Sequence, residues 1–356
     1  MISSLRNPVF ITGATGFVGS QIARHYLTAG HAVSALKRPN AGYGMLADIA
    51  GQITWHEGDL LDIPSLETAI VPGASTAPAG TPERDRPGCD VIHAAAVVSF
   101  APKDRRRMEA VNVEGTANVV NVCLKAGVRK LGYVSSVAAL GRPTAQTGTT
   151  DAPVVIDENQ KWEDSPNNSF YAQTKYRAEL EVWRGVAEGL NAVLVCPSVV
   201  LGAGDWSRSS LQLIRYVADE KPFYPAGLAN YVDVLDVVDA LYGLMQSDTT
   251  NARYILSGGT IPYRALLEQI AAVLGKRPPA TRVPPALARV LWPLEAVRAW
   301  LTGNEPLITR ETARSAQSAY RYDGHRIEQA LDFQYRPLAE TLLRVADAFG
   351  TVPPGA

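Results

Sequence analysis

Cysteine is scarce in this chain of 356 residues, and Cys89, Cys123 and Cys196 are far apart and odd in number. Their spacing fits neither a disulfide framework nor a zinc site, so we expect reduced thiols and no metal. Lys and Arg number 34 against 35 Asp and Glu, a net charge of -1, which argues against a nucleic-acid-binding protein. There is no signal-peptide pattern and no run of about 20 apolar residues. We therefore expect a cytoplasmic protein with no membrane span.

What the chain does contain is a glycine-rich turn near its N-terminus. Val9 to Ile11 form an apolar run typical of a fully buried strand, and residues 20–27 have helical apolar spacing. Between them lie Gly13, Gly16 and Gly19, where the backbone can approach a pyrophosphate beside a helix N-terminus. The spacing differs from the common G-x-G-x-x-G, and the triplet alone also fits an ordinary strand-to-helix turn. It predicts a dinucleotide-binding βαβ unit if later motifs agree.

Two basic residues, Lys37 and Arg38, end the second predicted strand. In dinucleotide-binding folds an acidic residue about 20 positions after the glycines binds the ribose 2′-hydroxyl, whereas an arginine there accommodates a 2′-phosphate. No Asp or Glu lies nearby, so the sequence favours NADP over NAD. The alternative is a pair of basic residues that only solvate the strand end.

Six strand-like runs alternate with helical segments over the first 200 residues. The strands are predicted at Val9–Ile11, Ala32–Leu36, Ile53–His56, Asp90–His93, Lys130–Val134 and Ala192–Cys196, and later helices at 105–126, 263–274, 286–301 and 338–348. This alternation indicates an α/β fold with a doubly wound parallel sheet. We expect a dinucleotide-binding domain over 1–200 with a surface insertion at 72–88. Residues 201–356 would form most of a smaller, discontinuous substrate lobe, with 231–257 returning to the first domain.

The candidate chemistry lies in Tyr171 and Lys175, which a Tyr-x-x-x-Lys spacing places one helical turn apart. A nearby ammonium lowers the pKa of a phenol and suits it to proton transfer with a carbonyl or alcohol oxygen. Ser136 ends the fifth strand and can hydrogen-bond the same oxygen. Either residue could instead be structural, because the motif alone is common. We expect His93 to be a packed histidine.

Eight motifs together resemble the extended short-chain dehydrogenase/reductases. In chain order they are TGATGFVG, GDLLD, HAAA, VNVEGTANVV, YVSS, YAQTK, PSVVLGAGD and YVDVLDVVDAL. The resemblance implies a catalytic triad of Ser136, Tyr171 and Lys175. Its implied cofactor-binding residues are Thr12, Gly13, Thr15, Gly16, Phe17, Val18, Gly19, Lys37, Arg38, Asp59, Leu60, Ala94, Ala95, Ala96, Lys175, Pro197 and Ser198.

Within that group the sequence favours the dihydroflavonol reductase and 3β-hydroxysteroid dehydrogenase branch. Val195-Cys196-Pro197-Ser198 stands where nucleotide-sugar epimerases often have Arg-x-x-Asn. We expect an NADP(H)-dependent oxidoreductase that reduces an aldehyde or ketone, or oxidises the alcohol. The alternatives are an NAD-dependent nucleotide-sugar epimerase/dehydratase and a non-catalytic NADP-binding sensor or scaffold. The resemblance also implies a homodimer.

Overall fold

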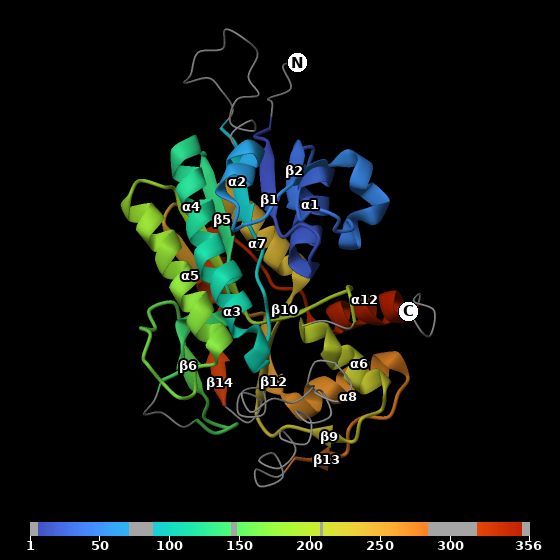
Figure 1. Cartoon of the computed structure of the whole chain (residues 1–356). Coiled ribbons are helices and arrows are strands. Elements are labelled where there is room, and N and C mark those ends of the chain that lie inside the picture. The colour runs from blue at the N-terminus through green and yellow to red at the C-terminus, as the bar shows by residue number, and fades with distance from the viewer. Residues whose placement is uncertain (1–5, 71–87, 144–147, 207–208, 284–318, 351–356) are drawn as a thin grey trace.

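A computed structural model describes residues 6–70, 88–143, 148–206, 209–283 and 319–350 (Figure 1). Residues 72–87 of the predicted insertion and the predicted helix at 286–301 lie outside these ranges. In the described part, no helix is long and apolar enough to cross a membrane.

A parallel sheet of seven strands forms the centre of the larger part of the molecule. Its order is β11-β7-β5-β4-β1-β2-β3. The strands are β1 (Val9–Thr12), β2 (Val33–Lys37), β3 (Thr54–Glu57), β4 (Asp90–His93), β5 (Lys130–Val134), β7 (Ala192–Pro197) and β11 (Ala252–Leu256). The predicted fold class is therefore confirmed. The connections reverse direction between β1 and β4, which is where ligands bind in open α/β sheets.

Helices cover both faces of this sheet because its strands alternate apolar side chains between two cores. Val9 and Ile11 pack with the first set of helices and Phe10 with the second. The first set is α1 (Phe17–Thr28), α7 (Val234–Gln246) and α11 (His325–Leu331); the second is α2 (Ile63–Ile70), α4 (Gly115–Ala126) and α5 (Phe170–Ala187). Figure 1 shows α4 and α5 side by side.

The predicted helix at 105–126 is interrupted in the structure. A π-helical segment, Glu109–Glu114, separates α3 (Arg105–Met108) from α4. Within it, Asn112 is buried and bonds to Val97 and Thr174, on neighbouring parts of the fold. Apolar periodicity does not reveal such a bulge, because an inserted residue leaves both flanking helices regular.

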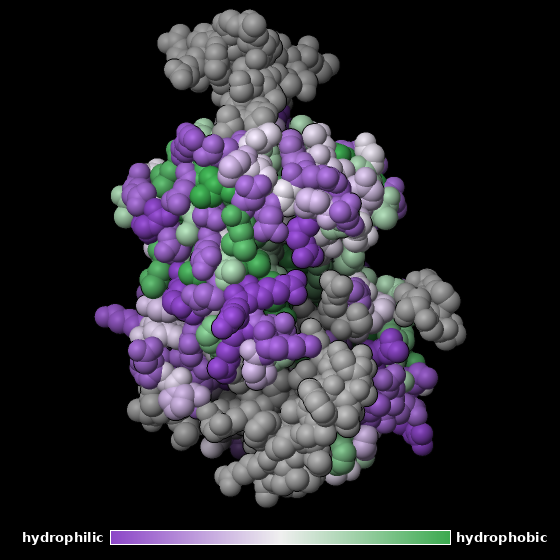
Figure 2. Space-filling view, viewed as in Figure 1, coloured by the Kyte–Doolittle hydropathy of each residue, from purple (hydrophilic) through white to green (hydrophobic). Residues whose placement is uncertain are grey.

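The smaller part of the molecule is built from short sheets and helices around a separate core. Its sheets are β8 (Val199–Leu201), β10 (Leu228–Asp233) and β12 (Gly259–Pro262); β6 (Val154–Ile156) with β14 (Tyr320–Tyr322); and β9 (Phe223–Tyr224) with β13 (Thr281–Arg282). Its helices are α6 (Gln212–Ala218), α8 (Tyr263–Leu274) and α12 (Leu338–Gly350). Figure 2 shows hydrophilic residues gathered across the middle of the molecule, at the level of α3.

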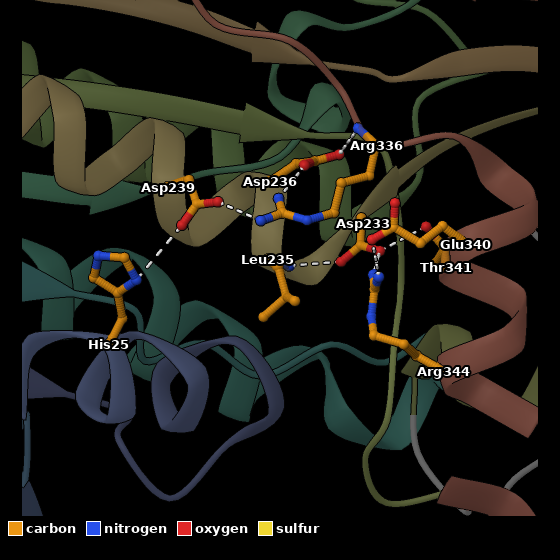
Figure 3. Close-up of polar contacts among 9 residues, drawn as sticks. All are labelled: His25, Asp233, Leu235, Asp236, Asp239, Arg336, Glu340, Thr341 and Arg344. Atoms are coloured by element: carbon orange, nitrogen blue, oxygen red, sulfur yellow. Dashed lines mark hydrogen bonds and ion pairs between the residues drawn. The ribbon is translucent and has the colours of Figure 1, made fainter. Parts of the chain in front are cut away.

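Ion pairs join the two parts at the N-terminus of α7 (Figure 3). Asp233 caps α7 by accepting from the Leu235 N–H, and it also accepts from Thr341 and Arg344 of α12. One turn further, Arg336 donates to Asp236 at 2.5 Å and to Asp239 at 2.7 Å. We call these residues the α7 ion cluster.

Candidate active site

The glycine turn lies against the loop that follows β4. Gly13 has a φ of +73°, and a Cβ built there would come within 2.5 Å of the Ala95 nitrogen. A Cβ on Gly19 would lie 2.2 Å from the Gly13 carbonyl oxygen. Both positions therefore require glycine, one for its backbone conformation and both for the close approach.

The N-terminus of α1 lies next to this turn. Its N-cap, Gly16, makes no side-chain hydrogen bond to the backbone N–H groups of the first turn, and that turn contains no acidic residue. A helix of this length presents a partial positive charge at such an end. The cradle therefore fits the pyrophosphate of a dinucleotide.

At the carboxyl end of β2 the two predicted basic residues have different surroundings. Lys37 pairs with Glu57 at 2.5 Å, across the register between β2 and β3. Arg38 is exposed and lies beyond the strand end. Arg38 is therefore the better placed of the two to meet a 2′-phosphate.

Further predicted cofactor-binding residues border the same strand edge. Asp59 accepts a hydrogen bond from the Leu61 N–H at 2.9 Å, and Leu60 is buried. Ala94 continues β4 and donates to the Thr12 carbonyl at 3.1 Å. Ala96 is exposed. These residues are brought to the edge where the fold binds ligands.

The structure brings Ser136 and Tyr171 to the same edge of the sheet, because the turn Val137–Leu140 that Ser136 caps packs against α5. Ser136 follows the end of β5, and its Oγ accepts from the Ala138 N–H at 3.2 Å. Tyr171 lies in the first turn of α5 beside Phe100, with ring centroids 6.1 Å apart. A hydroxyl pair at the carboxyl edge of a parallel sheet is suited to binding a substrate oxygen.

Lys175 lies one turn further along α5, and only 1% of its surface is exposed. Its ammonium donates to the Tyr133 hydroxyl at 2.7 Å and to the Val134 carbonyl at 3.0 Å. Burial lowers the pKa of Lys175 to about 8, opposed by the charge of Glu179. The lysine is therefore held on β5 rather than directed at the Tyr171 hydroxyl.

The pKa of Tyr171 differs in direction from the sequence-based expectation. Burial raises it to about 12, while the neighbouring Ser136 hydroxyl acts in the opposite sense. The Lys175 ammonium is directed at Tyr133 and Val134, so its charge does not outweigh the effect of burial on Tyr171. Tyr171 is thus a protonated phenol at neutral pH, the form that a proton donor needs.

Pro197 and Ser198 lie where β7 ends, on the same edge of the sheet. The Ser198 N–H donates to the Leu256 carbonyl at 2.9 Å. Its Oγ is buried and has no hydrogen-bond partner within the described residues. Such an atom calls for a partner, and a polar ligand group such as a carboxamide would supply one.

Several buried polar residues of the site carried no individual prediction. Asn112 lies within the VNVEGTANVV motif but has no catalytic pattern of its own. Glu179 is buried beside Lys175, where it accepts from Ser135 at 2.5 Å and from Arg253 at 2.9 Å. In the sequence, such residues could be recognised only as polar positions on the buried face of an otherwise apolar helix or strand. This pattern indicates that the residue is buried, but not which residue it contacts.

Comparison with known proteins identifies the family. The model of the NAD dependent epimerase/dehydratase family matches residues 9–256. The chain belongs to this family. It is therefore an enzyme of the short-chain dehydrogenase/reductase type, from a group that uses nicotinamide dinucleotides.

Individual relatives include both reductases and an epimerase. A Synechocystis sp. protein provisionally named dihydroflavonol 4-reductase is 29% identical over 94% of this chain and 92% of its own. Cinnamoyl-CoA reductase 1 of Oryza sativa subsp. japonica is 29% identical over 77% of each chain. The solved UDP-glucose 4-epimerase of Thermotoga maritima has a TM-score of 0.72 at 18% identity, covering 96% of this chain and 98% of that one. The last likeness concerns the fold alone.

Proposed function

We propose that this enzyme reduces an aldehyde or ketone with NADPH, or oxidises the corresponding alcohol. The observation that carries the proposal is the arrangement at the sheet edge: Ser136 caps the turn Val137–Leu140, which packs against α5, and α5 carries Tyr171 and, one helical turn further, the buried Lys175. The reductase relatives support this branch of the family.

In the proposed reduction, the carbonyl oxygen takes hydrogen bonds from the Ser136 and Tyr171 hydroxyls. Tyr171 then transfers its proton to that oxygen as negative charge develops on it. The Lys175 charge stabilises the resulting phenolate. Ser136 keeps the oxygen in place during the transfer. In the oxidative direction the same groups act in reverse.

The cofactor would lie across the glycine turn with its pyrophosphate at the N-terminus of α1. Arg38 would contact the 2′-phosphate, Lys175 the nicotinamide ribose and Ser198 the carboxamide. When bound, the reduced nicotinamide supplies the hydride. The steric requirement for Gly13 and Gly19 and the unpartnered Ser198 Oγ both support this placement.

A second candidate is epimerisation of a nucleotide sugar with NAD. The family description and the epimerase fold support it, because oxidation of a sugar hydroxyl needs the same proton-transfer group. The Cys196-Pro197-Ser198 sequence, in place of Arg-x-x-Asn, favours the reductase.

The test is a substrate panel assayed with each nucleotide. Purified protein is incubated with NADPH or NADH and with aldehydes, ketones, dihydroflavonols or cinnamoyl-CoA, and nucleotide consumption is followed. A parallel assay supplies UDP-glucose and NAD. Turnover with a carbonyl and NADPH, lost in Tyr171→Phe, supports the proposal. Epimerisation without carbonyl reduction contradicts it and supports the second candidate; cofactor binding without any turnover indicates a sensor.

A further inference from the structure

A row of polar side chains crosses the central sheet beneath the candidate site. Thr12 of β1 is the register partner of His93 on β4, and His93 is the partner of Tyr133 on β5. All three are at most 1% exposed. Residues in register point to the same face of a sheet, so the row continues from the glycine turn towards Lys175.

Hydrogen bonds join the first part of this row to Thr116 of α4. Thr12 Oγ1 lies 2.6 Å from His93 Nδ1, and His93 Nε2 lies 3.0 Å from Thr116 Oγ1. The His93 ring also packs beside the Tyr133 ring, with centroids 5.5 Å apart. The Tyr133 hydroxyl accepts from the Lys175 ammonium at 2.7 Å. We call Thr12, His93, Thr116, Tyr133 and Lys175 the buried chain.

One arrangement of protons satisfies the buried chain. Thr116 donates its only hydroxyl proton to the Asn112 carbonyl at 2.6 Å, so it must accept from His93. His93 therefore carries its proton on Nε2, and Nδ1 accepts from Thr12. Burial lowers the pKa of His93 to about 3, which keeps the ring neutral. The Tyr133 oxygen accepts from the Lys175 ammonium.

We propose that Tyr133 is a positioning residue for Lys175, in a buried row that the neutral Nε2–H form of His93 keeps free of a second positive charge. This inference rests on the proposed catalytic role of Lys175. The two acceptors on β5 take two of the three ammonium protons and leave one for the candidate site. The ring also contributes, since the ammonium lies 4.4 Å from its centroid.

Other titratable groups surround the same ammonium. Glu179 lies one turn along α5, and its charge favours the ammonium. Cys196 on β7 is a neutral thiol, because burial raises its pKa well above the usual value. His93 faces it from β4, and Tyr171 lies on the preceding turn of α5. Arg253 pairs with Glu179 at 2.9 Å. Within the described residues, the Lys175 ammonium donates a hydrogen bond to the Tyr133 hydroxyl and to none of these other groups.

The first test needs neither cofactor nor turnover. The chain has five histidines, so imidazole ¹⁵N spectra of histidine-labelled protein can be assigned by the loss of one signal in His93→Gln. A neutral Nε2–H tautomer from pH 8 to pH 5 supports the chain. An Nδ1–H tautomer, or protonation near the usual pH of about 6.5, overturns it.

The second test is Tyr133→Phe, which removes the acceptor oxygen and keeps the ring. The NADPH dissociation constant is measured from pH 6 to pH 10. Since the hydrogen bond favours the ammonium over the neutral amine, we expect the rise in the dissociation constant at alkaline pH to move down by about one pH unit. Turnover at pH 7 should fall about tenfold.

Tyr26→Phe is the matched control, because Tyr26 is also 1% exposed and lies on α1, in the core on the opposite face of the sheet. In Tyr26→Phe, the pH at which the NADPH dissociation constant rises should be unchanged, even if stability changes. If that pH is also unchanged in a folded Tyr133→Phe protein, the positioning role is overturned. If Tyr171→Phe has lost turnover in the same assays, the proposed function still stands; if Tyr171→Phe keeps turnover, that function fails instead.

Discussion

The two polar networks of the molecule hold charge in different ways. The buried chain contains one charged group, the Lys175 ammonium, among neutral hydrogen-bonding side chains. The α7 ion cluster instead matches carboxylates directly with guanidinium groups from the C-terminal segment, such as Asp236 with Arg336. Arg336 and Arg344 remain about one-third exposed, whereas Asp233 and Asp236 are buried.

This difference indicates which network supports the reaction and which holds the two parts of the molecule together. Neutral hydrogen-bond partners orient the Lys175 ammonium and leave its positive charge free to interact with a ligand. A matched ion pair uses the charges on both sides and fixes two segments together. We therefore expect changes in the buried chain and the site to alter rate, and changes in the α7 ion cluster to alter stability.

The largest effect should come from Tyr171→Phe, which removes the proton donor and keeps the ring. Turnover should fall by about 10²–10⁴-fold, the usual range for general acid–base help. Steady-state kinetics with NADPH and the best carbonyl substrate measure it, with NADPH binding by fluorescence as the control. Near-normal turnover in a chemistry-limited assay would falsify the assignment of Tyr171.

Asp236→Ala should lower the free energy of unfolding by about 3 kcal/mol, because it breaks a buried ion pair. Urea denaturation measures this loss, and turnover per folded molecule should be unchanged. Arg264→Ala is the control: it breaks an exposed pair with Glu268, and such pairs contribute about 0.5 kcal/mol or less. Similar losses in both variants would remove the distinction between the cluster and ordinary surface pairs.

Arg38→Ala should weaken NADPH binding by about tenfold or more and barely affect NADH, since only NADPH has the 2′-phosphate. Titration with each nucleotide gives the ratio. Arg24→Ala removes an arginine that already pairs with Asp48, so it controls for net charge. Equal losses for NADPH and NADH in Arg38→Ala argue against 2′-phosphate recognition.

His93 should make stability depend on pH between about 6.5 and 3. The folded-state pKa is lowered to about 3, so the unfolded chain binds an extra proton in that window and stability falls as the pH falls. The contribution is about 1.4 kcal/mol per pH unit at most. Urea denaturation from pH 7 to pH 4 should therefore give a flatter profile for His93→Gln, and parallel profiles would contradict a neutral buried ring.

The sequence determined the parallel α/β class of the large sheet, the positions of its strands along the chain and the position of the glycine turn. Strands β4 and β5 have the predicted limits, because an apolar run bounded by turn residues can be recognised from the sequence alone. Helix α1 begins at Phe17 rather than at the predicted Ser20. The short strands β6, β8 and β14 were not predicted. They have three residues each, too few for a periodic pattern, and they form only through pairing with distant segments.

Candidate site residues that have a local pattern could likewise be identified from the sequence. Tyr171 and Lys175 are four apart on one helix, so helix geometry alone places them together. The partners of Lys175 could not be identified in this way, because Tyr133 is 42 residues away on another element. Thr12 and His93 are 81 residues apart, and their contact follows from the register between β1 and β4. Local propensity fixes each strand, whereas only the pairing of strands decides which buried polar groups meet.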